Sequence, residues 1–142
     1  MTLEFIVKKD CEGIDFAEVV EILKRVGMRY HDPVVQEKAF RNSECTIFIF
    51  DKETLVGFAR AISDGAIQAA VYDVAVHPSY QGKGLGKIVV EKIKEELVGY
   101  NLILYATPGK EGFYRKSGFK KMLTGMALFQ DVEVKEERGF IE

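Results

Sequence analysis

The chain has 142 residues, of which 47% are hydrophobic and 30% charged, and its formal net charge is −2. This composition excludes a disordered or fibrous protein, and the near-neutral charge argues against a nucleic-acid partner. No apolar run approaches the roughly 20 residues that cross a bilayer, and the first residues lack the pattern of a signal peptide. We therefore expect one cytoplasmic domain over residues 1–142, monomeric or homodimeric, with no membrane partner and a loose tail over residues 135–142.

The first half of the chain predicts one strand, two helices and three further strands. An apolar run predicts a strand over residues 3–8. Asp15 caps the first helix, and Pro33 begins a second helix that runs to about Asn42. The three strands that follow are joined by short polar turns and most simply form an antiparallel meander; they cover residues 45–50, 55–62 and 68–76.

The second half begins with an amphipathic helix. Apolar residues recur at spacings of three and four from Leu85, and Gly99 ends the helix. A buried strand over residues 102–106 follows, and it lies parallel to the strand at 68–76 if the helix is a crossover. The rest predicts a short helix over residues 110–117 and two strands near 119–123 and 126–134.

A glycine-rich loop separates the strand ending at Val76 from the amphipathic helix. Gly82, Gly84 and Gly86 remove three β-carbons, so backbone N–H groups can approach a ligand closely. The next helix begins there, and its N-terminus presents unpaired N–H groups that favour an anion. We therefore predict a loop that binds pyrophosphate.

Spacing excludes two nucleotide-binding motifs for this loop. A phosphate-binding G-x-x-x-x-G-K-[ST] loop needs glycine where Gln81 stands and Ser or Thr where Ile88 stands. A dinucleotide-binding G-x-G-x-x-G pattern needs glycine at Lys87 or Val89. The two histidines and two cysteines have no metal-ligand spacing, so we expect no metal.

Two segments together carry a family resemblance. Gln81-Gly82-Lys83-Gly84-Leu85-Gly86 follows a Gln/Arg-x-x-Gly-x-Gly/Ala pattern, and Gly112-Phe113-Tyr114-Arg115-Lys116-Ser117-Gly118-Phe119 is similar to a Phe-Tyr-x-x-x-Gly-Phe segment. With these segments the chain resembles the GNAT superfamily of acetyl-CoA-dependent N-acetyltransferases over nearly all of residues 3–129. Residues 57–65 and 72–74 are similar to the branch that includes plant serotonin N-acetyltransferases.

The resemblance implies an α/β fold of the α+β type. The expected sheet is mixed but mostly antiparallel, with six to seven strands and about four helices, and its central parallel strand pair splays apart around the CoA site. Backbone groups of Val74 and Val76 would contact the pantetheine arm of acetyl-CoA. The loop would bind the cofactor, mainly its pyrophosphate, through Gln81, Gly82, Lys83, Gly84, Leu85, Gly86 and Lys87.

Two residues are candidates for catalysis. Tyr114 matches the family position that protonates the departing thiolate, as a phenol can; the alternative is an aromatic ring packed beside Phe113 and Phe119. Asp73 lies in an otherwise apolar strand, where a carboxylate is unfavourable unless it is paired or useful. It would take the amine's proton or attract the amine, and the alternative is a structural partner for Arg60.

The resemblance also implies where the acceptor binds. Tyr72 matches a residue that lines the acceptor pocket in the serotonin-type branch, and Tyr30 lies in a connection that often covers this pocket. The hypothesis is acetyl transfer from acetyl-CoA to a primary amine by direct attack in a ternary complex, and the alternative is a non-catalytic acyl-CoA-binding or regulatory module. The sequence leaves open an arylalkylamine, a polyamine, an amino sugar, and a lysine or N-terminal amine of a protein.

Overall fold

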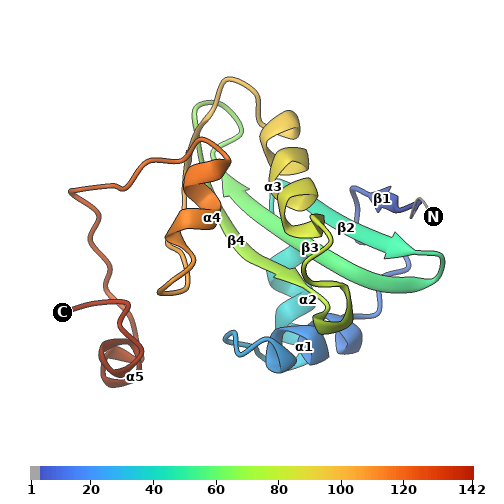
Figure 1. Ribbon diagram of the computed structural model, residues 1–142, viewed down its shortest axis with the longest axis horizontal. Helices are drawn as coiled ribbons and strands as arrows, with labels where there is room; N and C mark the ends of the chain where they lie inside the picture. Colours follow the sequence, from blue (N-terminus) through green and yellow to red (C-terminus); the bar gives the residue numbers. More distant parts are fainter. Residues whose placement is uncertain (1–3) are drawn as a thin grey trace. The chain divides into compact units, whose positions relative to one another are not determined.

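The computed structural model describes residues 4–142, which form two compact units. The first unit extends to Leu104, and the second spans Tyr105–Glu142. The first contains a five-stranded sheet with helices on both of its faces, and the second contains two short helices (Figure 1). Among the described residues, no helix is both long and apolar enough to cross a membrane.

The sheet of the first unit has the strand order β1-β2-β3-β4-β5. Neighbouring strands are antiparallel except for β4 and β5, which are parallel. The predicted meander and the predicted crossover between the parallel strands are therefore confirmed. The strands are β1 (Ile6–Lys8), β2 (Cys45–Asp51), β3 (Thr54–Ser63), β4 (Gln68–Val76) and β5 (Asn101–Ile103).

Local signals start the first helices where the sequence predicts. α1 (Phe16–Arg25) follows Asp15, whose carboxylate accepts the N–H of Ala17 at 2.9 Å. α2 (Pro33–Arg41) follows Asp32, which accepts the N–H of Val34 at 2.9 Å. Each carboxylate satisfies an N–H that has no partner inside its helix. The third helix, α3 (Leu85–Glu96), is the crossover between β4 and β5.

Two hydrophobic cores lie on opposite faces of the sheet. The α3 core contains Leu85, Val89 and Ile93 of α3 with apolar residues of β2, β3 and β4. On the other face, rings of α1, α2, β2 and β3 have centroids 5.5 to 6.2 Å apart; they belong to Phe16, Phe40, Phe48 and Phe58. Each buried Phe contributes about 1.5–3 kcal/mol to stability, so this aromatic cluster fixes α1 and α2 against the sheet.

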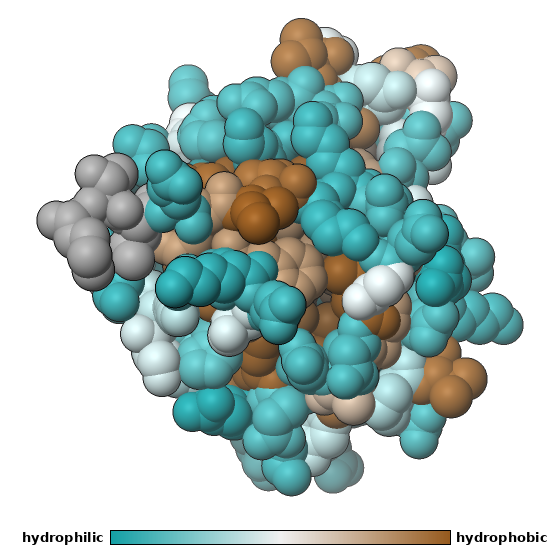
Figure 2. Space-filling view, turned by 90° about the vertical axis from the view of Figure 1, so that its right-hand side faces the viewer, coloured by the Kyte–Doolittle hydropathy of each residue, from teal (hydrophilic) through white to brown (hydrophobic). Residues whose placement is uncertain are grey.

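The surface seen in Figure 2 is mostly hydrophilic, with apolar side chains gathered near its middle. Some apolar residues of the first unit are exposed, such as Ile6 on β1, which is 57% exposed. Isolated exposed apolar side chains are normal on globular proteins.

The second unit differs from the expectation. It contains α4 (Glu111–Lys116), as predicted, but residues 119–130 form no strand and Val132–Glu137 is helix α5. The prediction of strands near 119–123 and 126–134 is therefore wrong. The described chain has five strands instead of six to seven, and five α-helices instead of about four.

The reason for this difference lies around Lys135. The β-branched Val132 and Val134 are typical of a strand, but Lys135 is buried, and its Nζ lies 4.6 Å from the centroid of the Phe140 ring and 5.0 Å from that of Phe129. The helical turn brings the ammonium to both rings, and such cation–π contacts favour it. Lys135, expected to begin a loose tail, is instead fixed by these contacts.

Two predicted strands are shorter than expected. The strand expected over residues 102–106 is β5, which ends at Ile103. The strand expected over 3–8 begins at Ile6, and Leu3 lies outside the described residues. Among the described strands, the short β5 leaves residues 71–76 of β4 without a partner on that side.

Candidate active site

Within the described sheet, β4 has a strand on both sides only at Ala69 and Ala70. Gln68, Ala69 and Ala70 pair with β5, whereas the pairing with β3 continues as far as Val76. Within the described sheet, residues 71–76 therefore have one edge without a strand partner. The parallel pair is thus hydrogen-bonded at one end only, and its splaying around a CoA site stays a prediction.

The backbone groups of Val74 and Val76 face this open edge. In an antiparallel pair, successive residues alternate between bonding the neighbouring strand and pointing away from it. The N–H of His77 donates to the carbonyl of Val56 on β3 at 2.8 Å, so the backbone N–H and carbonyl of Val76 point away from β3. The backbone groups of Val74, two residues before Val76, also point away from β3. Both residues can therefore hydrogen-bond an extended ligand, as predicted for the pantetheine arm.

A β-bulge interrupts the pairing of β3 with β4. Phe58 faces Ala75 and Arg60 faces Tyr72, so two residues of β4 lie opposite one residue of β3. One of the two is Asp73, whose φ is 57°. Left-handed backbone of this kind suits glycine and is less often adopted by Asn or Asp.

The bulge changes which face of the sheet the side chains meet. Before it, Ala69 and Val71 pack in the α3 core. After it, Val74 and Val76 pack against that core and Ala75 joins the aromatic core. A regular alternation would have placed Ala75 with Ala69 and Val71, so the sequence pattern alone misplaces this part of β4.

Asp73 is held by residues from two other elements. Nε of Arg60 on β3 donates to Oδ2 of Asp73 at 2.7 Å, and Nε2 of Gln36 on α2 donates to the same oxygen at 3.1 Å. The side chains of Arg60 and Asp73 are only 14% and 17% exposed. The Arg60 guanidinium also lies 5.2 Å from the ring centroid of Tyr72. The ion pair is the structural alternative for Asp73, and a role as base stays a prediction.

Sequence reasoning missed Gln36. This residue is 3% exposed, and its Oε1 is buried without a hydrogen-bond partner in the part of the chain that the structure describes. It lies one helical turn before the buried Phe40, so both face the sheet. A polar residue four positions before a core aromatic was the signal that could have found it.

The loop after β4 has an unusual backbone. His77 caps the short 3-10 helix η1 (Pro78–Tyr80), because its Nδ1 accepts the N–H of Ser79 at 3.0 Å. Gly82 and Gly84 have φ of 80° and 81°, which explains why glycine stands at both positions. A β-carbon at either one would meet no described atom within 4 Å. The space beside the loop is therefore open to a ligand.

The N-terminus of α3 is prepared for an anion. No side chain caps it at Gly84, and its first turn contains no acidic residue. The N–H groups of Leu85, Gly86 and Lys87 have no acceptor within the helix and lie at the positive end of its dipole. Lys83 and Lys87 are exposed beside them. These groups fit the pyrophosphate that the resemblance assigns to the loop.

Other side chains brace the loop against the sheet. The Tyr80 hydroxyl donates to Oδ2 of Asp51 at 2.7 Å, and this hydrogen bond raises the pKa of the phenol. Nζ of Lys83 lies 5.0 Å from the Tyr80 ring centroid. Gln81 donates from Nε2 to the carbonyl of Val76 at 3.2 Å, so its contact with pyrophosphate stays a prediction. Sequence reasoning missed Tyr80 and Asp51, which no local pattern connects.

Tyr114 belongs to α4 in the second unit. Its ring packs between aromatic neighbours, with centroids 4.9 Å from Phe113 and 5.9 Å from Phe119. Burial raises the pKa of the Tyr114 phenol to about 12, so the phenol keeps its proton at neutral pH. This is the form that a proton donor needs. Because Asp73 lies in the other unit, the role of Tyr114 at the thioester stays a prediction.

Tyr30, the other acceptor candidate, lies between α1 and α2 and is 46% exposed. Nζ of Lys24 lies 6.0 Å from its ring centroid. The ring is accessible to a ligand, and acceptor binding there stays a prediction. Among residues 4–142, no group of three or more His, Cys, Asp or Glu side chains could hold a metal.

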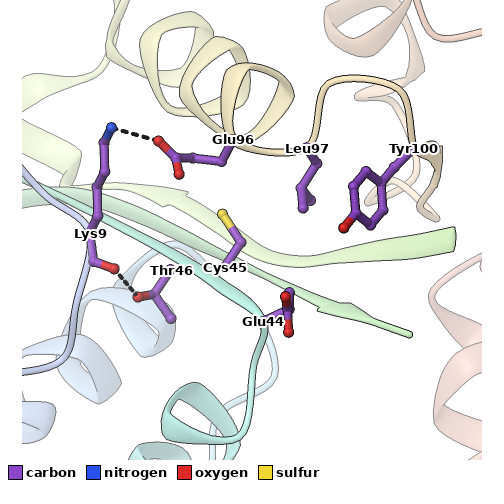
Figure 3. Close-up of a pocket in the computed structure, with 7 residues that line it drawn as sticks. All are labelled: Lys9, Glu44, Cys45, Thr46, Glu96, Leu97 and Tyr100. Carbon is purple, nitrogen blue, oxygen red and sulfur yellow. Dashed lines mark hydrogen bonds and ion pairs between the residues drawn. The ribbon is translucent and has the colours of Figure 1, made fainter. Parts of the chain in front are cut away.

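A pocket of about 190 Å³ lies at the opposite end of α3 and contains none of the predicted site residues (Figure 3). The length of α3, about 18 Å for 12 residues, separates it from the glycine loop. Lys9 and Glu96 form an ion pair of 2.5 Å across it. Burial raises the pKa of the Cys45 thiol to about 11, so this cysteine is an unreactive thiol. The residues that line the pocket are Lys9, Glu44, Cys45, Thr46, Glu96, Leu97 and Tyr100.

Known proteins are similar to this chain in sequence. The model of the acetyltransferase (GNAT) family matches residues 16–119. Serotonin N-acetyltransferase 2, chloroplastic, from Oryza sativa subsp. japonica is 36% identical over 137 residues, covering 89% of this chain and 68% of that protein. GCN5-related N-acetyltransferase 1, chloroplastic, from Arabidopsis thaliana is 34% identical over 120 residues, covering 81% of this chain and 61% of that protein. The cytoplasmic location expected for this chain stays a prediction.

Solved structures share the fold. A Staphylococcus aureus protein described as a probable acetyltransferase has a TM-score of 0.77 and 25% identity, covering 89% of this chain and 99% of that one. A GNAT family acetyltransferase from Streptococcus pneumoniae has a TM-score of 0.74 and 25% identity, covering 90% of this chain and 99% of that one. Since the family model also spans most of the sequence, the chain belongs to the acetyltransferase (GNAT) family and is an acyltransferase.

Proposed function

We propose that the protein transfers an acetyl group from acetyl-CoA to a primary amine by direct attack in a ternary complex. The GNAT family uses acetyl-CoA as its co-substrate. The observation that carries the proposal is the continuity of β4 with the glycine loop. The open edge at Val74 and Val76 leads, through residues 77–84, to the uncapped N-terminus of α3.

This continuity suits the two parts of the cofactor. The amide groups of an extended pantetheine arm can bond the edge of β4 as an added strand would. The pyrophosphate would then reach the N–H groups of the glycine loop and of the first turn of α3, where Lys83 and Lys87 offset its charge. The thioester would lie beside β4, near Tyr72 and Asp73.

The proposed reaction needs two proton transfers. The lone pair of a neutral amine forms a bond to the thioester carbon, and the bond from carbon to sulfur breaks as the tetrahedral intermediate collapses. The nitrogen loses one proton and the sulfur gains one, which gives an amide and free CoA. Tyr114 would protonate the sulfur. The amine's proton would pass to Asp73 or to a water relay, and since Oδ2 of Asp73 accepts from Arg60 and Gln36, the amine would meet Oδ1.

The proposed acceptor class rests on a relative's name and on the aromatic candidates Tyr72 and Tyr30. The rice relative is named a serotonin N-acetyltransferase, which supports testing arylalkylamines first. Tyr72 beside Asp73 could stack on an aromatic acceptor, and the exposed ring of Tyr30 could cover it. A monomer and a homodimer are both compatible with this proposal.

The test is thiol release from acetyl-CoA across a panel of amines. The panel would contain serotonin, tryptamine, spermidine, glucosamine and a lysine-containing peptide, with mass spectrometry of the acetylated product. We expect release with at least one amine and an equal amount of acetylated product. CoA binding without transfer to any amine would instead support the acyl-CoA-binding module.

A further inference from the structure

We propose that Arg60 and Gln36 are positioning residues that hold Asp73 in its left-handed conformation and so fix the bulge of β4 beside the thioester. The effect on catalysis rests on the proposed acetyl transfer. The effect on the bulge does not depend on it. Neither residue needs to touch either substrate.

The first step concerns the backbone of Asp73. Its φ of 57° brings the β-carbon of an L-residue close to its own carbonyl, which is unfavourable. Glycine adopts this conformation freely. An aspartate therefore stands where glycine would suit the backbone better, and interactions of its carboxylate must offset the strain.

The second step identifies these interactions. Arg60 and Gln36 donate to the same carboxylate oxygen at 2.7 and 3.1 Å, from a strand and from a helix. The pair with Arg60 is largely shielded from water, so its attraction is weakly screened. The carboxylate can reach both donors only from the backbone position that the bulge provides.

The third step shows that Arg60 is itself held in place. Its guanidinium carbon lies 5.7 Å from the Phe40 ring centroid and 5.2 Å from that of Tyr72. Its NH1 lies 3.4 Å from Oγ of Ser43. A guanidinium fixed between two rings is a rigid support for the carboxylate.

The fourth step concerns a buried amide oxygen of Gln36 that has no hydrogen-bond partner among the described residues. Oε1 of Gln36 is buried without a partner among the described residues, which destabilises the fold. A leucine would avoid this penalty. The amide is therefore retained for the bond that its Nε2 donates to Asp73, which points to a role beyond stability.

The consequence reaches the open edge of β4. A bulge inserts one residue, and without it every following residue turns to the other side of the strand. If Asp73 left its conformation, the backbone groups of Val74 would turn toward β3 and away from the proposed cofactor. Arg60 and Gln36 thus act on the thioester through the backbone of β4.

The test uses Arg60→Gln and Gln36→Leu. CoA affinity, measured by calorimetry, should fall because Val74 no longer bonds the pantetheine arm, but by less than about 100-fold, since the glycine loop is untouched. With the panel amine that gives the fastest thiol release, kcat should fall at least about tenfold, with an unchanged pH profile. Amide hydrogen exchange at His77, whose N–H bonds the carbonyl of Val56 on β3, should become faster. Unchanged kcat together with unchanged exchange in both variants would overturn the proposal.

Arg41→Gln is the matched control. Nε of Arg41 also lies 2.7 Å from a carboxylate oxygen, that of Glu37, but these side chains are 53% and 42% exposed. This substitution removes the same charge from the same kind of ion pair, so CoA affinity, kcat and exchange should stay at wild-type values. Equal losses in Arg41→Gln and Arg60→Gln would overturn the proposal, since they would show a general effect of charge.

A double variant tests the backbone claim directly. In Arg60→Gln with Asp73→Gly, the unpaired carboxylate is gone and glycine adopts the φ of 57° without strain. Exchange at His77 should return toward the wild-type rate. Exchange as fast as in Arg60→Gln alone would overturn the proposal. The exchange readout holds even if wild-type protein transfers no acetyl group, and Gln36→Leu replaces Arg60→Gln if that variant does not fold.

Discussion

The two halves of β4 differ in what their backbone does. Residues 69–71 pair regularly with β3, and residues 68–70 pair with β5. Residues 72–76 contain the bulge, have no strand on the β5 side, and lead directly into the glycine loop. One half pairs regularly within the sheet, and the other has an edge without a strand partner among the described residues, where we propose that the cofactor binds. A single strand can serve both purposes because its neighbour β5 is short.

The side chains follow the same division. Ala69 and Val71 are buried in the α3 core, whereas Tyr72 and Asp73 are partly exposed. The second half also retains a strained backbone and a buried ion pair, which are rare unless they have a purpose. Substitutions in the two halves should therefore affect different measurements.

The largest effect is expected from a substitution in the glycine loop, which follows the second half of β4. Gly84→Glu should abolish CoA binding in calorimetry, raising Kd by at least about 100-fold, because a carboxylate would stand at the anion site. Gly99→Glu is the matched control: its φ is 90°, a β-carbon there also meets nothing within 4 Å, and it lies beyond the other end of α3. Micromolar affinity in Gly84→Glu, or equal loss in both variants, would contradict the proposed cofactor site.

The next effect concerns the proposed proton donor. Tyr114→Phe should lower kcat by about 10²–10⁴-fold if its proton reaches the sulfur, with CoA affinity unchanged. Tyr105→Phe removes a hydroxyl from another aromatic residue of the second unit and should leave kcat unchanged. Wild-type turnover in Tyr114→Phe would leave aromatic packing as its only role.

A smaller effect separates the first half of β4 from the second. Val71→Ala should lower the free energy of unfolding by about 2 kcal/mol, because Val71 is 5% exposed and its loss leaves a cavity in the α3 core. CoA affinity should not change. Val74→Ala, at a partly buried position, should destabilise less in urea unfolding. Equal destabilisation would remove the distinction between the halves.

The smallest expected effect is on the pH profile. An unperturbed tyrosine loses its proton near pH 10, but the pKa of Tyr114 is raised to about 12. Because the protonated phenol is the active form, kcat should not fall through ionisation of Tyr114 below about pH 11. The neutral phenol contributes stability that is fully present below about pH 10 and is lost as pH rises through about 12. An alkaline limb near pH 10 that disappears in Tyr114→Phe would contradict this assignment.

Much of the first unit could be predicted from local patterns. Asp15 and Asp32 cap helices through bonds to residues two positions away, and the glycine loop depends on its own φ values. The second unit was harder, because Val132 and Val134 mimic a strand while contacts of Lys135 with two aromatic rings favour a helix. Distant side chains, absent from any short pattern, decided that segment.

The sequence by itself determined the succession of strand, glycine loop and helix, because glycine conformation, helix caps and apolar spacing depend on residues a few positions apart. Only the tertiary structure decided where β5 stops pairing with β4 and which partners Asp73 has. Arg60 and Gln36 lie 13 and 37 positions from Asp73 and come from different elements. The bulge that joins them reverses the side-chain pattern of β4, and such a shift follows from packing between elements and not from local preference.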